Sequence, residues 1–287
     1  MLACAHVESR SSRLPVRLRA TAATLLGPLH ARAADARRLL PLLGDDHARV
    51  LVERLDHDFS RFEDRPRFAS VVRTLVFDDI VRTFLCAHPA GTVVELGVGL
   101  NTRFERLDNG RQRWFDVDLP EVTTLRRALL PSSARRLHVA ASVVDPSWLE
   151  LVATAPAPYC FVLEAMLGYV PCDQVRGVLA RIAYRFPGST IAFDLHPQWA
   201  FIGSELVKSV TPIGLLGPDI PRTIERWKIG LTLVETTRFL GSTPRTPGPL
   251  VLGATRAVDL RAPHVIARFV ADRCVHPRFL DASRRRR

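Results

Sequence analysis

The chain has 287 residues, and its 40 basic side chains against 29 acidic ones give a formal net charge of +11. A hydrophobic content of 47% is enough for a sizeable core. No apolar run approaches the roughly 18 residues that a membrane-spanning helix needs, and no secretory signal pattern is present, so we expect a soluble, cytoplasmic protein without a membrane partner.

The positive charge raises the question of nucleic-acid binding. Only Lys208 and Lys228 are lysine, and the arginines are scattered instead of forming one stripe with interleaved aromatics. We therefore interpret them as a solvated surface and expect no nucleic-acid partner. The run Arg284 to Arg287 predicts a disordered basic tail. The five cysteines lack a C-x-x-C pair, which favours reduced thiols.

The first 90 residues are helical in pattern and show no strand pattern. Asp45 and Asp46 can cap a helix whose apolar positions are Ala48, Leu51, Val52 and Leu55. A second helix would carry Val72, Leu75, Val76, Ile80 and Phe84. We expect residues 1–90 to form a helical cap over a ligand site built by residues 91–287.

From about residue 90 onward, strand and helix patterns alternate. Several of the strand-like runs are almost continuously apolar, which is typical of parallel strands covered on both faces. A crossover helix at 174–186 ends at Pro187 and Gly188. The pattern predicts an α/β fold with a Rossmann-like, doubly wound, mainly parallel seven-stranded sheet. Its strands would be 93–96, 113–116, 137–140, 159–163 and 190–193, with 231–239 and 250–257 as an antiparallel edge pair.

A glycine turn follows the first of these strands. The sequence there reads E-x-G-x-G, with Glu95, Gly97 and Gly99, and the next strand ends in Asp116 and Asp118. Glycines let a ligand approach the backbone, and an acidic side chain about 20 residues further on can accept hydrogen bonds from ribose hydroxyls. The pattern predicts a pocket for a cofactor that contains a nucleoside.

The identity of the cofactor follows from what the turn lacks. A dinucleotide fingerprint needs a third glycine where this chain has Thr102, which argues against NAD and FAD, and no phosphate-binding P-loop motif occurs. A cofactor with adenosine but no phosphate fits best. Glu95 would lie beside a cationic amino-acid group, which S-adenosylmethionine carries.

Four segments follow one another along the chain: VVELGVGLNTRFERLDNG, RWFDVDLPEVTTLRRALLP, ASVVDPSWL and FVLEAMLGYVPCDQVRGVLARIAYRFPG. In this order they resemble the leucine carboxyl methyltransferase family. The similarity is greatest to its bacterial branch of polyketide carboxyl and hydroxyl O-methyltransferases, and it runs from about residue 16 to 239. Asn101 stands where that family usually has Asp. The resemblance implies S-adenosylmethionine as cofactor, Asp118 on its ribose and Arg73 on its carboxylate.

Candidate site residues follow from this pattern, because open α/β sheets bind ligands at the carboxyl ends of their strands. Asp118 is the ribose ligand with Asp116 as the alternate, unless Asp118 caps the helix that begins near Pro120. Arg73 binds the cofactor unless it forms a salt bridge with an acid of its own region, Asp78, Asp79 or Glu53. Glu164 either reaches the cofactor or accepts from buried backbone amides, and Arg103 is interpreted as structural. The full predicted cofactor set is Arg73, Glu95, Gly97, Gly99, Asn101, Asp116, Asp118, Ser142, Val143 and Glu164, with the last three on the adenine or methionine side.

The methyl acceptor decides whether a catalytic base is needed. Methyl transfer from a sulfonium is an in-line substitution that depends mainly on alignment. A carboxylate acceptor, which we favour, needs no base, whereas a hydroxyl acceptor would need one. His196 is then the candidate base, unless it caps the next helix, and Tyr169 is a candidate for orienting the acceptor.

The main hypothesis is therefore an O-methyltransferase acting on a small, polyketide-like secondary metabolite. Alternatives are a family member that uses the same cofactor site for another step such as ring closure, an NAD-dependent oxidoreductase and a nucleic-acid-binding protein. No metal cluster is apparent, and the sequence does not indicate an oligomeric state.

Overall fold

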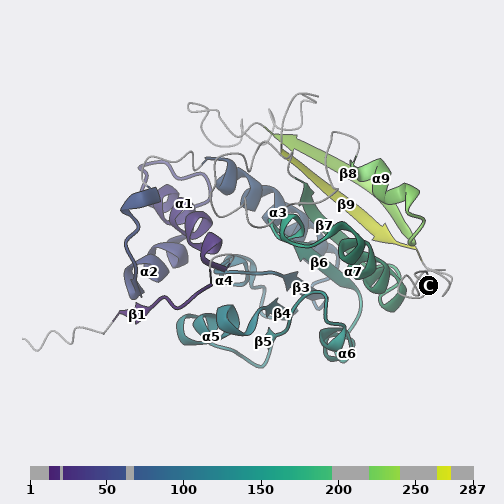
Figure 1. Ribbon diagram of the computed structural model, residues 1–287, viewed down its shortest axis with the longest axis horizontal. Coiled ribbons are helices and arrows are strands. Elements are labelled where there is room, and N and C mark those ends of the chain that lie inside the picture. Colours follow the sequence, from purple (N-terminus) through teal and green to yellow (C-terminus); the bar gives the residue numbers. More distant parts are fainter. Residues whose placement is uncertain (1–12, 20–21, 63–67, 196–219, 240–263, 273–287) are drawn as a thin grey trace, which may run out of the picture.

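The computed structural model describes residues 13–19, 22–62, 68–195, 220–239 and 264–272, and the statements below concern these residues. A single seven-stranded sheet forms the centre, with helices on both faces (Figure 1). The predicted Rossmann-like α/β class is confirmed. Within the described residues, no helix combines the length and the apolar character needed to cross a membrane.

The sheet has the strand order β5-β4-β3-β6-β7-β9-β8. Five strands are parallel, and β9 and β8 add the antiparallel edge pair. Because the chain runs outward from β3 to β5 and then returns to β6 beside β3, the order reverses between β3 and β6. The strands are β3 (Thr92–Leu96), β4 (Arg113–Asp118), β5 (Arg136–Ala140), β6 (Tyr159–Leu163), β7 (Thr190–Leu195), β8 (Leu231–Phe239) and β9 (His264–Ala271).

The predicted strands agree with this sheet except at its edge. Strand β8 lies where it is predicted, but its antiparallel partner is β9 at His264–Ala271. The predicted strand 250–257 lies outside the described residues. The run H-V-I-A-R-F-V-A alternates apolar and polar residues only in part, and its Arg268 is explained by an ion pair with Glu235 across the pair of strands.

The two faces of the sheet are covered by different helices. Helix α3 (Phe68–Ala87) packs on one face, where Val76, Phe77 and Val81 meet sheet residues such as Val93. On the other face, α7 (Cys172–Arg185) buries a stripe of Val175, Val178, Leu179 and Ile182, and α6 (Ser147–Val152) and α9 (Ile220–Arg226) join it. Helix α7 begins two residues before the predicted start and ends one residue before the predicted end.

The N-terminal segment divides into two parts by packing. Helix α1 (Leu26–Ala36), preceded by a 3-10 turn η1 (Ala22–Leu25), and α2 (Asp46–Arg54) share an apolar cluster with α5 (Pro120–Leu129). In Figure 1 this pair lies to the left, on the side away from β8 and β9. Helix α3, by contrast, is a layer of the core. The helical cap therefore consists of α1 and α2 and not of the whole segment 1–90, although that segment has a helical sequence pattern throughout.

Two details of the cap differ from or extend the predictions. A short parallel pairing joins β1 (Leu14–Pro15) to β2 (Leu55–Asp56), so the expectation of no strand in this segment is wrong. The predicted cap residue Asp45 accepts a hydrogen bond from the amide of Ala48. Its carboxylate also accepts from Arg32, Thr102 and Arg106, which ties the cap to α4 (Arg103–Leu107).

Candidate functional site

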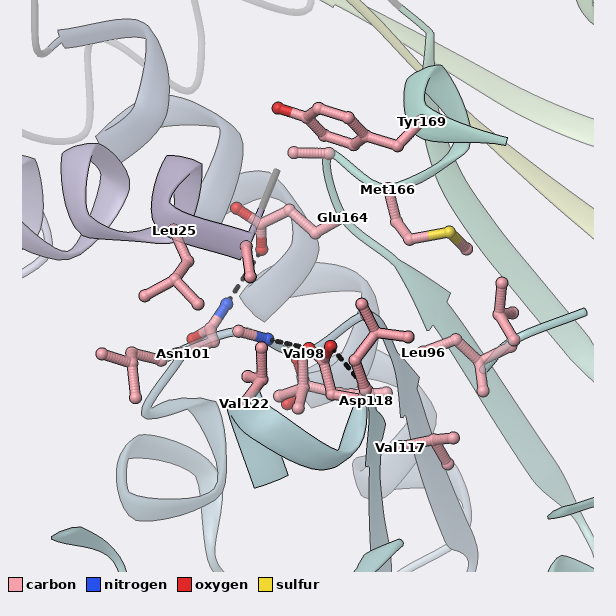
Figure 2. Close-up of a pocket in the computed structure, with 18 of the residues that line it drawn as sticks. Leu25, Leu96, Val98, Asn101, Val117, Asp118, Val122, Glu164, Met166 and Tyr169 are labelled. Carbon is pink, nitrogen blue, oxygen red and sulfur yellow. Dashed lines mark hydrogen bonds between the residues drawn. The ribbon is translucent and has the colours of Figure 1, made fainter. Parts of the chain in front are cut away.

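A cavity of about 300 Å³ lies at the carboxyl ends of β3, β4, β5 and β6, beside the point where the strand order reverses. Open α/β sheets bind their ligands at this position. The cap closes the cavity on one side through Leu25 of η1 and Pro28 and Arg32 of α1. Figure 2 shows Tyr169 and Glu164 on one side of it and Asp118 on the other.

The glycine turn forms the floor of the cavity, and both glycines are needed for geometric reasons. Gly97 has φ +67° and Gly99 has φ +54°, a region that residues with a Cβ rarely adopt. A Cβ on Gly97 would lie 2.4 Å from Cγ of Met166, so the space that glycine leaves is filled by this side chain. Met166 is thus a lining residue that the sequence patterns do not single out.

Asp118 faces the cavity from the end of β4 and is fixed by two backbone amides. Its Oδ2 accepts from the amide of Gly99 and its Oδ1 from the amide of Leu119, each at 2.7 Å. Burial raises the pKa of Asp118, and these two amide bonds oppose that rise. Helix α5 takes Leu119 as its N-cap residue and shows no side-chain cap bond, so the alternative of a capping role for Asp118 is not observed.

Asp116, the alternate ribose ligand, does not line the cavity. It is 1% exposed, and its Oδ2 lies 2.8 Å from Arg126, 2.7 Å from Arg136 and 2.9 Å from His138. Burial raises its pKa, but the neighbouring Arg126, His138 and Arg136 outweigh this and hold it far below its ordinary value. We call Asp116, Arg126, Arg136 and His138 the rear cluster, because it lies behind the glycine turn. The cluster occupies Oδ2 of Asp116, and Nε1 of Trp114 donates to its Oδ1 at 3.2 Å.

Arg103 is the centre of a second buried group, which we call the front cluster: Arg103, Asp78, Glu95 and Glu164. The Arg103 side chain is fully buried and bonds to all three carboxylates. This agrees with its predicted structural role. Glu95 lines the cavity as predicted, but its carboxylate is paired with Arg103, and burial raises its pKa to about 7.

Glu164 reaches the cavity, but its hydrogen bonds come from protein side chains. Oε1 accepts from Arg73 at 3.1 Å and Thr74 at 3.0 Å, and Oε2 accepts from Asn101 at 3.0 Å and from Arg103. The donors to Glu164 are thus side chains and not the backbone amides of the alternative interpretation, while its contact with a cofactor stays a prediction. A carboxylate has about four acceptor positions, and the protein fills them. Burial raises the pKa of Glu164, yet the charges of Arg103, Arg73 and Arg32 lower it to about 2.

The hydrogen bonds of Asn101 explain why an amide suits this position. Its Nδ2 donates to Glu164, and its Oδ1 accepts from Arg106 at 3.2 Å. A carboxylate at this position could not donate to Glu164 and would repel it. The amide in place of the family's usual Asp therefore fits its neighbours.

Arg73 lines the cavity from α3 and is 9% exposed. Its Nε donates to Glu164, and Oδ2 of Asp194 lies 3.7 Å away. Asp78, Asp79 and Glu53 are not its partners, because their ion pairs are with other arginines. Nε is the nitrogen that bonds within the described residues, which leaves the two terminal nitrogens as donors for a ligand.

Arg32 is a second lining arginine, and the sequence patterns do not single it out. It is 3% exposed, its Nε donates to Asp45 at 3.1 Å, and its Nη2 donates to the carbonyl of Leu100 at 2.8 Å. A charged side chain on an apolar helix face is a sequence signal that indicates a buried partner, and Arg32 shares such a face with Leu29 and Ala33. Arg32, Arg73, Arg103, Arg126 and Arg136 are all buried, so the interpretation as a solvated surface does not hold for these five arginines.

The remaining predicted residues divide between the cavity and the part of the chain outside the described residues. Ser142 and Val143 line the cavity after β5, together with Ala141 and Leu119, and Tyr169 lines it from the 3-10 turn η3 (Leu167–Tyr169). His196 lies outside the described residues. In the described part of the chain, no group of three or more His, Cys, Asp or Glu side chains is arranged to hold a metal ion.

Comparisons with known proteins identify the family of this chain. The leucine carboxyl methyltransferase family model matches residues 25–183. The tetracenomycin polyketide synthesis O-methyltransferase TcmP of Streptomyces glaucescens is 32% identical over 233 residues, which are 79% of this chain and 86% of that protein. The S-adenosyl-L-methionine-dependent methyltransferase dpfgK of Gibberella zeae is 30% identical over 60% of this chain and 64% of that protein.

Solved structures show the same fold. The crystal structure of a DUF574 family protein from Streptomyces avermitilis matches with a TM-score of 0.54 and 17% identity, over 88% of this chain and 99% of that chain. The family match covers the cap, the glycine turn, both aspartates of β4, strand β6 and Glu164, which follows it. The chain therefore belongs to the leucine carboxyl methyltransferase family and is an S-adenosylmethionine-dependent methyltransferase.

Proposed function

We propose that this methyltransferase transfers its methyl group to an oxygen atom of a small, polyketide-like molecule, and that the cofactor lies between Asp118 and Arg73. One observation carries the placement of the cofactor: a single cavity has a fixed carboxylate acceptor at Asp118 and buried arginine donors at Arg73 and Arg32. The similarity to a polyketide O-methyltransferase supports the class of acceptor.

The residues of the cavity fit the parts of S-adenosylmethionine. Asp118 has one oxygen on each of two amides, and the remaining lone pairs can accept from the two ribose hydroxyls. Val143 and Ser142 offer an apolar wall and a hydroxyl to the adenine. Arg73 can bind the carboxylate of the methionine part through its terminal nitrogens.

The charge of the site also suits the cofactor. Glu95 and Glu164 both line the cavity, and Glu164 stays ionised because its pKa is about 2. Fixed negative charge near the turn favours the ammonium and sulfonium groups. These carboxylates are held by Arg103 and its neighbours, so they need not rearrange when the cofactor binds.

When bound, the cofactor supplies a methyl group on a positively charged sulfur that an oxygen nucleophile can attack in line. The chain's own residues bind and orient the two reactants and exclude water from the cavity. Met166 and Tyr169 border the part of the cavity near Glu164 and would face the acceptor (Figure 2).

Our first candidate for the acceptor is a carboxylate, which is ionised near neutral pH and needs no base. A hydroxyl acceptor would need a base, for which His196 remains the candidate by sequence position. We further propose that the protein works in the cytoplasm without nucleic-acid or membrane partners.

The test is an assay with paired acceptors. A panel of polyketide-like aromatic acids and their hydroxyl counterparts is incubated with S-adenosylmethionine, and mass spectrometry detects the added methylene mass. Methyl ester formation on the acids supports the proposal, and His196→Ala should then leave kcat nearly unchanged. Methylation of the hydroxyls alone, with a kcat for His196→Ala that is lower by about 10²- to 10⁴-fold, would replace the carboxylate by a hydroxyl. Transfer to nitrogen or carbon only would reject oxygen as the acceptor.

A further inference from the structure

The side chain of Arg126 reaches from α5 to the back of the glycine turn. It is 1% exposed and does not line the cavity. Its Nη1 donates to the carbonyls of Gly99 and Asn101, both at 2.8 Å, and its Nη2 donates to Asp116 at 2.8 Å. One guanidinium therefore joins the rear cluster to two carbonyls of the turn.

Gly99 is consequently held on both sides of its peptide chain. Its amide donates to Asp118 at 2.7 Å, and its carbonyl accepts from Arg126. Gly99 has φ +54°. Because glycine has no side chain, its backbone could also adopt other angles. External hydrogen bonds are therefore needed to fix the direction of its amide, and with it the direction of the Asp118 carboxylate.

We propose that Arg126 is a positioning residue for the cofactor site: it fixes the glycine turn so that Asp118 faces the ribose. This inference rests on the proposed role of Asp118 in ribose binding. Both acids of the D-x-D segment then act on the same glycine, Asp118 directly and Asp116 through Arg126.

The expected effect is large because binding groups must be held within about 0.5 Å of their working geometry. Removing Arg126 frees the carbonyls of Gly99 and Asn101, and the turn can rotate about Gly99. We expect cofactor affinity to fall by about 10- to 100-fold.

Arg136 offers a matched control. Its side chain is equally buried, and its Nε donates to the same oxygen of Asp116 at 2.7 Å. Its Nη1 bonds to Glu105, and among the described residues no bond joins the Arg136 side chain to the glycine turn. Arg136→Met should therefore lower stability much as Arg126→Met does, because each removes one cation from Asp116. Cofactor affinity should stay within about twofold in this control.

The experiment measures binding of S-adenosylhomocysteine and of 5′-methylthioadenosine by calorimetry for the wild type, Arg126→Met and Arg136→Met. The second ligand keeps the ribose and adenine but lacks the amino-acid part. The proposal predicts an equal fold-loss for both ligands in Arg126→Met and no such loss in Arg136→Met. Circular dichroism and thermal melting verify that each variant is folded.

Arg126→Lys keeps a buried cation and serves as the test if Arg126→Met does not fold. A lysine ammonium cannot span the three acceptors, so affinity for both ligands should still fall while the fold is kept. Unchanged affinity in either folded Arg126 variant overturns the proposal, and so does an equal loss in Arg136→Met. A wild-type protein that binds neither ligand would instead contradict the proposed cofactor site.

Discussion

The front and rear clusters are opposite solutions to burying charge within one small region. In the front cluster one cation, Arg103, is surrounded by three carboxylates, whereas in the rear cluster one carboxylate, Asp116, is surrounded by three basic side chains. Glu95 and Glu164 of the front cluster line the cavity, and no member of the rear cluster does. Two acids of the front cluster therefore face the cavity, and Arg126 of the rear cluster contacts the glycine turn from behind.

The comparison also explains why two aspartates that are only two residues apart behave differently. Asp116 points to arginines, which lower its pKa, while Asp118 points to backbone amides at the cavity and its pKa is raised by burial. Side chains at i and i+2 of a strand share one face of the sheet. Asp118 is the last residue of β4, so its carboxylate lies at the carboxyl end of the strand and reaches the amides of Gly99 and Leu119, whereas Asp116 lies two residues deeper in the sheet.

Removing the centre of the front cluster should have the largest effect. Arg103→Met leaves Asp78, Glu95 and Glu164 buried without their shared cation, and we expect a loss of about 3–5 kcal/mol in the free energy of unfolding. Urea denaturation measures this. Arg135→Met is the control, since Arg135 pairs with Asp108 at the surface and its loss should shift the midpoint far less. Equal shifts would contradict the structural role of Arg103.

Removing Asp118, the aspartate that lines the cavity, should have the second-largest effect. Asp118→Ala removes the proposed acceptor for the ribose and should weaken S-adenosylhomocysteine binding by about 2–4 kcal/mol, roughly 30- to 1,000-fold. Asp116→Ala should act mainly on stability, because it leaves three buried basic groups without their carboxylate. Calorimetry and denaturation on both variants separate the two roles. Normal binding by a folded Asp118→Ala protein would show that the ribose lies elsewhere.

A single charge added to the front cluster should cost less. Asn101→Asp loses the donor to Glu164 and places a second carboxylate beside it, for an expected loss of about 1–3 kcal/mol in stability. Asn109→Asp is the matched control, because Asn109 lies in an exposed loop where its side-chain oxygen accepts from two backbone amides, as Asp can, and only an exposed bond from its Nδ2 to the carbonyl of Pro89 is lost. Thermal melting of both variants tests this, and an Asn101→Asp protein as stable as the wild type would argue against the assigned contacts.

The smallest expected effect is a pH dependence from Glu95. Burial raises its pKa from 4.5 to about 7, so the folded state holds a proton that the unfolded state releases. This contribution to stability is complete below pH 4.5 and is lost as the pH rises through 7. Glu95→Gln should remove this slope, a difference on the order of 2 kcal/mol across that range. Denaturation curves at several pH values check it, and an identical slope in both proteins would assign the proton to another group.

Much of the core could be predicted from sequence because its determinants are local. The apolar run Thr92–Leu96, the turn glycines and the Asp45 cap each act through their immediate neighbours. The predicted parallel strands therefore agree with the sheet to within two residues at either end.

The partners of buried charges could not be predicted in the same way. Arg73 and Glu164 are 91 positions apart in sequence, and Arg126 reaches Asp116 and the turn only after β4 and α5 have packed. Two helices with similar sequence patterns can also pack against different parts of the protein, as α1 and α3 show. Helix α1 packs against α2 and α5, while α3 packs on the apolar face of the sheet. Which helix covers that face depends on the folded sheet and not on the helix sequence alone.

The central claim is that one cavity holds S-adenosylmethionine with its ribose on Asp118 and its carboxylate on Arg73. Calorimetry on Arg73→Ala with S-adenosylhomocysteine and with 5′-methylthioadenosine, which lacks the carboxylate, tests it most directly. We predict that affinity for the first ligand falls by about tenfold or more, since a charge-assisted bidentate contact is lost, and that affinity for the second is nearly unchanged. A folded Arg73→Ala protein that binds S-adenosylhomocysteine as tightly as the wild type would contradict this placement of the cofactor.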